Sequence, residues 1–205
     1  QLPDGVLYLS NAGSSDGSYK YRCEFPSLAN RKFYTLSSDD SILDIVEHLF
    51  KVNKLIFSRP ELRYLNGYII QLAKAIGVEV VFDYDDLLLP DYSDKLGHVR
   101  SLRSNIVSSY RTALSKLAYI HYADGFVLST AELAKQFEVY GKKGEVSNNK
   151  LPSSFFAKPK STEVNDNKIN LIYLSGTPTH KRDFLTINSV LLKLAQDHGE
   201  KFTLT

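Results

Sequence analysis

Short apolar segments alternate with stretches of helical periodicity along the chain, and this alternation limits the possible folds more than any other feature. The apolar segments lie at residues 5–10, 54–58, 78–83 and 124–129, and the helical patterns between and after them lie at 39–51, 60–77, about 94–122 and 130–141. Such alternation is typical of βαβ units, whose parallel strands are covered by their connecting helices. We therefore predict an α/β fold with a Rossmann-like parallel sheet and helices on both faces.

A polar stretch divides the chain into two parts. Residues 150–168 contain two prolines and show no periodicity, and a new strand–loop–helix pattern starts at residue 169. We predict an N-terminal Rossmann-like domain at 1–152, a linker at 153–168, and the truncated start of a second Rossmann-like domain at 169–205. Because the second pattern stops after about one βαβ unit, we expect the chain to be a fragment of a longer protein.

The composition excludes several classes of protein. The chain is 43% hydrophobic with a formal net charge of +2, which is too small to indicate nucleic-acid binding. No stretch reaches the roughly 18 apolar residues that indicate a transmembrane helix. The single cysteine, Cys23, excludes an internal disulfide framework and favours a reducing, cytoplasmic location.

Three carboxylates lie within four positions at the end of the third apolar segment: Asp83, Asp85 and Asp86. The carboxyl ends of parallel strands meet at one edge of a sheet, where ligands usually bind. We therefore expect the acids to lie in a cleft with the residues that follow the other strands, which are Arg59, Ser129 and Thr130. The alternative is structural, because aspartates also cap turns and Arg59 could neutralise one of them. Alternation along the strand predicts that Asp83 is buried more deeply than Asp85 and Asp86, so Asp83 is the acid that we expect to be structural.

The same segment also permits an enzymatic hypothesis of another class. FDYDDLLL resembles the first motif of the haloacid dehalogenase phosphohydrolases, which would make Asp83 a nucleophile and Asp85 a general acid beside Mg²⁺. The segment differs from that motif at two positions, because Asp86 replaces glycine and Leu87 replaces threonine or valine. It also lies on the third strand, whereas the motif normally lies on the first.

A second resemblance covers more of the chain. In order, six segments resemble those of GT-B glycosyltransferases of the retaining family 4 group, in particular its bacterial branch that acts in surface polysaccharide synthesis. They are VLYLSNAGSSDGSYKYR, KLIFSRPEL, GVEVVFDYDDLL, YADGFVLSTAELAKQF, VSNNKLP and IYLSGTPTHKRDFLTI.

This resemblance implies transfer of a sugar from a nucleotide-sugar to an acceptor, with retention at the anomeric carbon and without a bound metal or cofactor. The active site would lie between the two domains, with a glycan or lipid-linked acceptor on the N-terminal side. The fragment alone would bind donor poorly and catalyse little. A non-catalytic α/β binding module is the remaining alternative.

The resemblance also implies roles for particular residues. Asp85 and Asp86 would be the catalytic pair, one of which orients an acceptor hydroxyl. The donor diphosphate would lie against the loop after the second domain's first strand, at Gly176, Thr177, His180 and Lys181. The substrate cleft would be lined by Gly13, Tyr21, Arg22, Arg59, Asp83, Ser129 and Thr130. The alternative for Tyr21, Arg22 and Arg59 is structural pairing with the acids. The apolar stripe of residues 60–77 could contact the inner face of a membrane, but a core-facing helix is the stronger interpretation because its polar face carries no basic cluster.

Overall fold

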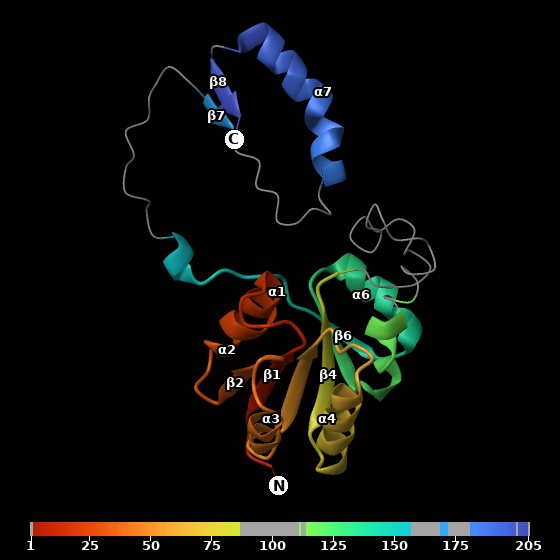
Figure 1. Ribbon diagram of the computed structural model, residues 1–205. Helices are drawn as coiled ribbons and strands as arrows, with labels where there is room; N and C mark the ends of the chain where they lie inside the picture. Colours follow the sequence, from red (N-terminus) through yellow and green to blue (C-terminus); the bar gives the residue numbers. More distant parts are fainter. Residues whose placement is uncertain are drawn as a thin grey trace.

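The computed structural model describes residues 2–86, 111, 114–156, 169–171, 181–199 and 201–204. Its main feature is a six-stranded parallel sheet in the order β2-β1-β3-β4-β5-β6 (Figure 1). The strands are β1 (Val6–Ser10), β2 (Phe33–Leu36), β3 (Lys54–Ser58), β4 (Glu79–Tyr84), β5 (Gly125–Leu128) and β6 (Lys143–Val146). This sheet, with helices around it, confirms the predicted Rossmann-like α/β fold.

The helices lie in the connections between the strands. The short helices α1 (Gly17–Tyr19) and α2 (Phe25–Ser27) flank a π-helical turn, η1 (Lys20–Glu24). The longer helices of this part are α3 (Ile42–Leu49), α4 (Tyr64–Ala75) and α6 (Ala131–Phe137). The 3₁₀ turns are η3 (Ile120–Tyr122), η4 (Glu138–Tyr140) and η5 (Ser153–Phe156). Most of the helix expected at about 94–122 lies outside the described residues.

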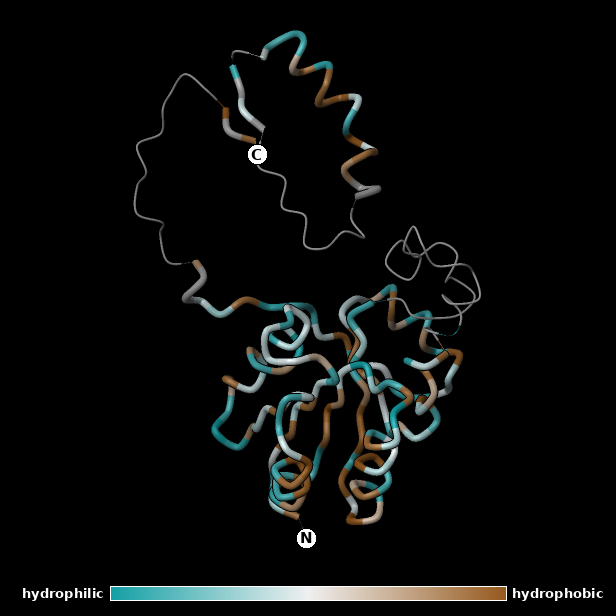
Figure 2. Tube along the Cα trace, viewed as in Figure 1, coloured by the Kyte–Doolittle hydropathy of each residue, from teal (hydrophilic) through white to brown (hydrophobic). Residues whose placement is uncertain are grey.

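Alternation along β4 shows that both faces of the sheet are covered. Phe82 and Tyr84 belong to the hydrophobic core, together with residues of α3 and α4 such as Ile45 and Ile69. Asp83 points to the opposite face, where it pairs with Arg22 of η1. Figure 1 shows α3 and α4 together in front of the sheet, and Figure 2 shows hydrophobic residues concentrated along the central strands.

The strand order reverses between β1 and β3. From β1 the chain passes to β2 on one side, and from β2 it returns past β1 to β3, after which each new strand is added on that second side. In a doubly wound sheet, the crevice at such a reversal is the usual place for a ligand. The reversal therefore locates the part of the sheet edge where a site is expected.

The remaining described elements form a separate two-stranded parallel sheet. Its strands are β7 (Ile169–Leu171) and β8 (Phe202–Leu204), with α7 (Lys181–His198) between them in the chain. The strand–helix–strand pattern predicted after residue 169 is present, whereas most of the predicted linker lies outside the described residues. Among the helices that the structure describes, none is both long and apolar enough to cross a bilayer.

Candidate functional site

The ends of three neighbouring strands bring the predicted acids together with Arg59 and Ser129. Ser58 at the end of β3 is in register with Asp83, and Leu128 at the end of β5 is in register with Tyr84. The hydroxyl of Ser129 donates to the carbonyl oxygen of Asp85 at 2.8 Å. The expected convergence at the carboxyl edge is therefore present.

Asp83 is held in a buried ion pair with Arg22. Nε of Arg22 donates to both carboxylate oxygens, at 3.1 and 3.0 Å, and Nη2 also contacts Oδ1. The side chains of Arg22 and Asp83 are only 3% and 1% exposed. Burial lowers the pKa of Arg22, but the hydrogen bonds and charge of Asp83 outweigh burial and raise it overall, so the guanidinium stays charged.

The same arginine also holds the segment that follows β6, an edge strand of the sheet. Nη1 of Arg22 donates to the carbonyl oxygen of Ser147 at 2.6 Å and to Oδ1 of Asn149 at 3.1 Å. Arg22 therefore links η1, β4 and the segment after β6. Its position supports the structural alternative for this pair, and it leaves Asp83 without the access that a phosphohydrolase nucleophile requires.

Arg59 holds the two other acids. Its Nε donates to Oδ1 of Asp85 and its Nη2 to Oδ2 of Asp86, each at 2.5 Å. Asp85 is 11% exposed and Asp86 is 41% exposed, so Asp86 is the more accessible carboxylate. Burial lowers the pKa of Arg59, but the charges of Asp85 and Asp86 outweigh burial and raise it. One arginine therefore serves two acids, which leaves one negative charge in excess.

The backbone of Arg59 adopts an unusual conformation at this position. Its φ is +47°, in the left-handed region that side chains other than glycine rarely occupy. Its N–H donates to the carbonyl oxygen of Asp83 at 2.9 Å, and its carbonyl accepts from Nδ2 of Asn11 at 2.6 Å. These bonds on both sides hold the strained residue, and such strain often occurs at functional sites.

A polar cavity of about 190 Å³ adjoins Arg59 at the reversal between β1 and β3. Most of its lining follows these two strands or lies just beyond the first loop: Ser10, Asn11, Ala12, Asp16, Ser18, Ser58, Arg59, Glu61 and Lys116. Asn11 is oriented by Asn66, whose Nδ2 donates to its Oδ1 at 2.8 Å. Burial lowers the pKa of Lys116, and the charge of Arg59 lowers it further.

Most of this lining could not be identified from the sequence. Only Arg59 was among the predicted cleft residues. Asn11, which directly follows the first strand, is the residue that the strand-end rule could have indicated. Lys116 carries no local signal, because it comes from a helical segment 57 residues later in the chain than Arg59.

The other predicted cleft residues have different surroundings. A Cβ atom on Gly13 would lie 2.9 Å from Oδ2 of Asp39, so this glycine permits close approach of a carboxylate from the same protein. Thr130 caps α6 by accepting from the N–H of Leu133 at 3.1 Å. For Gly13 and Thr130, these local contacts account for the residue type.

The residues predicted to bind the donor diphosphate are not covered in the same detail. Gly176, Thr177 and His180 lie outside the described residues, as does the side chain of Lys181 at the start of α7.

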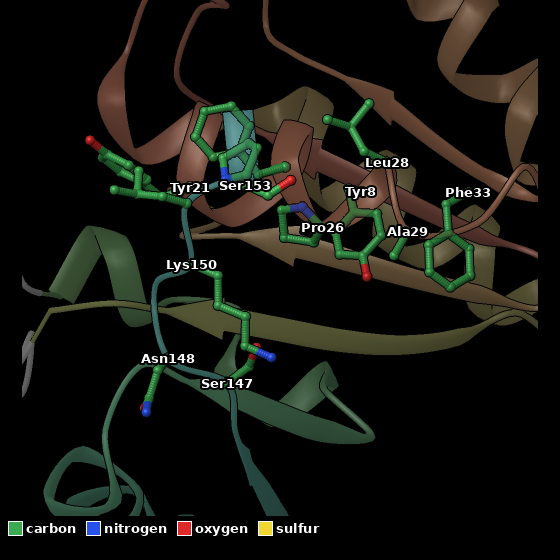
Figure 3. A pocket seen from close by; sticks show the side chains of 13 residues that line it. Tyr8, Tyr21, Pro26, Leu28, Ala29, Phe33, Ser147, Asn148, Lys150 and Ser153 are labelled. Carbon is green, nitrogen blue, oxygen red and sulfur yellow. The ribbon is translucent and has the colours of Figure 1, made fainter. Parts of the chain in front are cut away.

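Tyr21 lines a second and larger cavity of about 480 Å³. Figure 3 shows the rings of Tyr8, Pro26 and Phe33 on one side of it, with Ser147, Asn148 and Lys150 along the other. Tyr21 is therefore placed against an apolar cavity, whereas its neighbour Arg22 is directed to Asp83. Tyr21 and Arg22, both predicted to line the cleft, therefore lie in different surroundings.

The described residues contain no group of three or more histidine, cysteine, aspartate or glutamate side chains that could hold a metal ion. Cys23, beside Arg22, is fully buried, and burial raises the pKa of its thiol well above the usual value. The thiol therefore stays protonated and is not suited to nucleophilic chemistry.

Comparison with known proteins adds no family to this description. No protein-family model matches the chain, and no curated protein matches it significantly.

Proposed function

We propose that the chain is the acceptor-side part of a glycosyltransferase that moves a sugar from a nucleotide-sugar to a glycan or lipid-linked acceptor. The observation that carries this proposal is the position of Asp85 and Asp86 beside a polar cavity at the strand-order reversal. Carboxylates at this edge can accept a hydrogen bond from a hydroxyl that attacks a second substrate. The six ordered sequence segments support the same class.

In this mechanism, the two acids have unequal roles. Asp86 is the more exposed and would accept the hydrogen bond of the acceptor hydroxyl. Asp85 is more enclosed and receives both Nε and Nη2 of Arg59. Arg59 would act as a positioning residue that separates the two like charges and fixes their direction. The donor would be bound from the second domain, where α7 starts at Lys181, because a helix N-terminus attracts a diphosphate.

The test is consumption of nucleotide-sugars by the complete protein. We expect turnover with at least one donor from a panel of nucleotide-sugars in the presence of glycan and lipid-linked acceptors. Asp86→Asn should lower turnover by about 10²-fold or more, in the range of general-base contributions. Asp4→Asn is a matched control, because Asp4 precedes the amino end of β1, away from the carboxyl edge of the sheet, and its side chain is 83% exposed.

Three outcomes would contradict the proposal. The first is the absence of any donor consumption by a folded, complete protein. The second is unchanged turnover in Asp86→Asn and Asp85→Asn together. The third is saturable binding of a glycan with no transfer, which would favour the non-catalytic binding module.

A further inference from the structure

The polar cavity between the ends of β1 and β3 is small, and none of the described residues that line it is aromatic. Its volume of about 190 Å³ is below the roughly 300–1,000 Å³ of pockets for drug-sized ligands. Its lining consists mainly of hydroxyl, amide, carboxylate and cationic groups. A cavity of this size and chemistry suits one polar ring rather than a nucleotide or an apolar chain.

The charges around the cavity argue against an anionic ligand. Two cations, Arg59 and Lys116, and two carboxylates, Asp16 and Glu61, line it. Just outside the lining, Asp85 and Asp86 pair with Arg59, and Arg63 pairs with Glu61 at 3.0 Å. Among the described residues, three cations therefore face four carboxylates. A phosphate or carboxylate placed here would meet a surplus of like charge.

Both a hydrogen-bond acceptor and a hydrogen-bond donor remain for a ligand. Oδ1 of Asp16 accepts from the N–H of Ser18 at 2.7 Å, and within the described part of the chain no group donates to its Oδ2. Lys116 has no ion pair with any residue that the structure describes. A sugar hydroxyl both donates and accepts, so it can use a carboxylate and an ammonium group at the same time.

We propose that this cavity binds a single neutral sugar unit, with Asp16 accepting from its hydroxyls and Lys116 donating to them. This inference deepens the proposed function and rests on it in one respect, namely that the bound sugar is the acceptor. Arg59 lines the cavity and also pairs with Asp85 and Asp86. A sugar bound in the cavity therefore lies beside these two acids. The acceptor is therefore the neutral end of a glycan and not a lipid phosphate.

The experiment is a ligand titration of the complete chain, monitored by the chemical shifts of its amides in ¹H–¹⁵N NMR spectra. The probes are a panel of methyl glycosides of neutral hexoses and, separately, inorganic phosphate. We expect at least one glycoside to cause saturable shifts at Ser10, Asn11 and Lys116 that are unchanged by added salt, whereas phosphate causes none. Phosphate binding at these amides, or no shift with any glycoside, would overturn the proposal.

Two variants locate the binding. Asp16→Asn keeps a good helix cap, since asparagine and aspartate cap equally well, and it removes the charge. We expect glycoside affinity to fall at least about threefold, because hydrogen bonds to charged groups are roughly twice as strong as neutral ones. If the cavity instead bound an anion, Asp16→Asn would raise the affinity for that ligand. Lys116→Met should weaken binding about tenfold, and Lys135→Met on the exposed face of α6 should not change it.

The outcomes separate this inference from the proposed function. Glycoside binding that is lost in Lys116→Met, without consumption of any nucleotide-sugar, would retain the sugar site and overturn the transferase. Nucleotide-sugar turnover without glycoside-induced shifts at the cavity would support the transferase and overturn the sugar site. Glycoside binding that neither Asp16→Asn nor Lys116→Met changes, in variants whose spectra show the native fold, would place the sugar elsewhere and overturn the cavity assignment.

Discussion

The Arg22–Asp83 pair places two opposite charges inside the protein, so removal of one partner would leave the other buried alone. We expect Arg22→Met to lower the free energy of unfolding by about 3–5 kcal/mol, the usual cost of breaking a buried pair. The measurement is urea denaturation at neutral pH. Lys74→Met is the matched control, because its pair with Asp124 is more than a third exposed on both sides and should contribute less than about 1 kcal/mol.

A loss in Arg22→Met as small as that of the control would show that the pair is hydrated in solution. It would also remove the argument that Asp83 is too enclosed to act as a nucleophile. The stability measurement therefore tests the role of Asp83 as well as that of Arg22.

Arg59 combines a strained backbone with two ion pairs, and two variants can separate these contributions. Arg59→Gly and Arg59→Ala both remove the contacts with Asp85 and Asp86, but only glycine tolerates φ of +47° without strain. We expect the glycine variant to be more stable than the alanine variant by about 1 kcal/mol or more, measured by thermal unfolding. Equal stabilities would mean that the loop relaxes once the side chain is removed.

Burial at the residue scale was more predictable than pairing. Alternation along the third strand predicted that Asp83 lies deeper than Asp85 and Asp86, and its exposure of 1% confirms this. The partner of Asp83 could not be chosen from the sequence, because Arg22 is 61 residues away and is placed by the π-helical turn. The pairing of Arg59 with the acids was one of the alternatives left open.

At the scale of elements, the central strands were predicted and the first crossover was not. β2 is a short edge strand in which only Leu36 is buried, so it lacks the apolar run that marked the other strands. Gly13, Gly17 and the serines around them are residue types typical of a loop, whereas Asp16 caps the first of three consecutive helical turns there. Edge strands and short helices depend on tertiary packing more than on local propensity.

Asp124 joins three elements at the amino end of the sheet. Its Oδ2 accepts from the N–H of Val80 in β4 at 2.9 Å, and its Oδ1 accepts from Lys74 of α4 at 2.5 Å. Burial raises the pKa of Asp124, but these hydrogen bonds outweigh burial and lower it overall. A carboxylate with a lowered pKa in the folded state stabilises the protein above its unfolded pKa of about 3.9, and this contribution is lost as the pH falls further.

We therefore expect a pH-dependent cost for Asp124→Asn. At pH 7, the variant should be less stable than the original protein by about 1 kcal/mol, because solvent screens part of the ion pair. The difference should shrink as the pH falls below 4, where Asp124 of the original protein also becomes neutral. Denaturation with urea at several pH values measures it, and a difference that stays constant down to pH 2 would contradict the role of the carboxylate charge.

At the scale of the whole molecule, the topology explains why the position of the site was predictable and its lining was not. Parallel strands have their carboxyl ends at one edge, so the strand pattern was sufficient to bring Arg59, Asp85 and Ser129 together. The cavity depends in addition on the strand order, which places β1 between β2 and β3. Asn11 and Lys116 meet there because of this order and not because of any spacing in the sequence.

The two parts of the chain differ in how much apolar surface they bury, and this difference predicts a gradient of local stability. The core lies between the central strands of the large sheet and helices such as α3 and α4, and includes fully buried Phe57, Phe82 and Phe126. Among the side chains described in α7, none is buried, and Val190 and Leu192 are 59% and 57% exposed. A two-stranded sheet with so little burial is at best marginally stable in water.

Amide hydrogen exchange of the 205-residue chain measures this gradient directly. We expect amides of β3, β4 and β5 to exchange orders of magnitude more slowly than those of β7, β8 and α7, because the central strands open only in global unfolding. Phe126→Ala, which removes a fully buried ring and should cost about 3–5 kcal/mol, is expected to speed exchange in the central strands and leave that of α7 unchanged. Equal protection of α7 and β4, or a change in α7 caused by Phe126→Ala, would show that the two parts unfold as one cooperative unit.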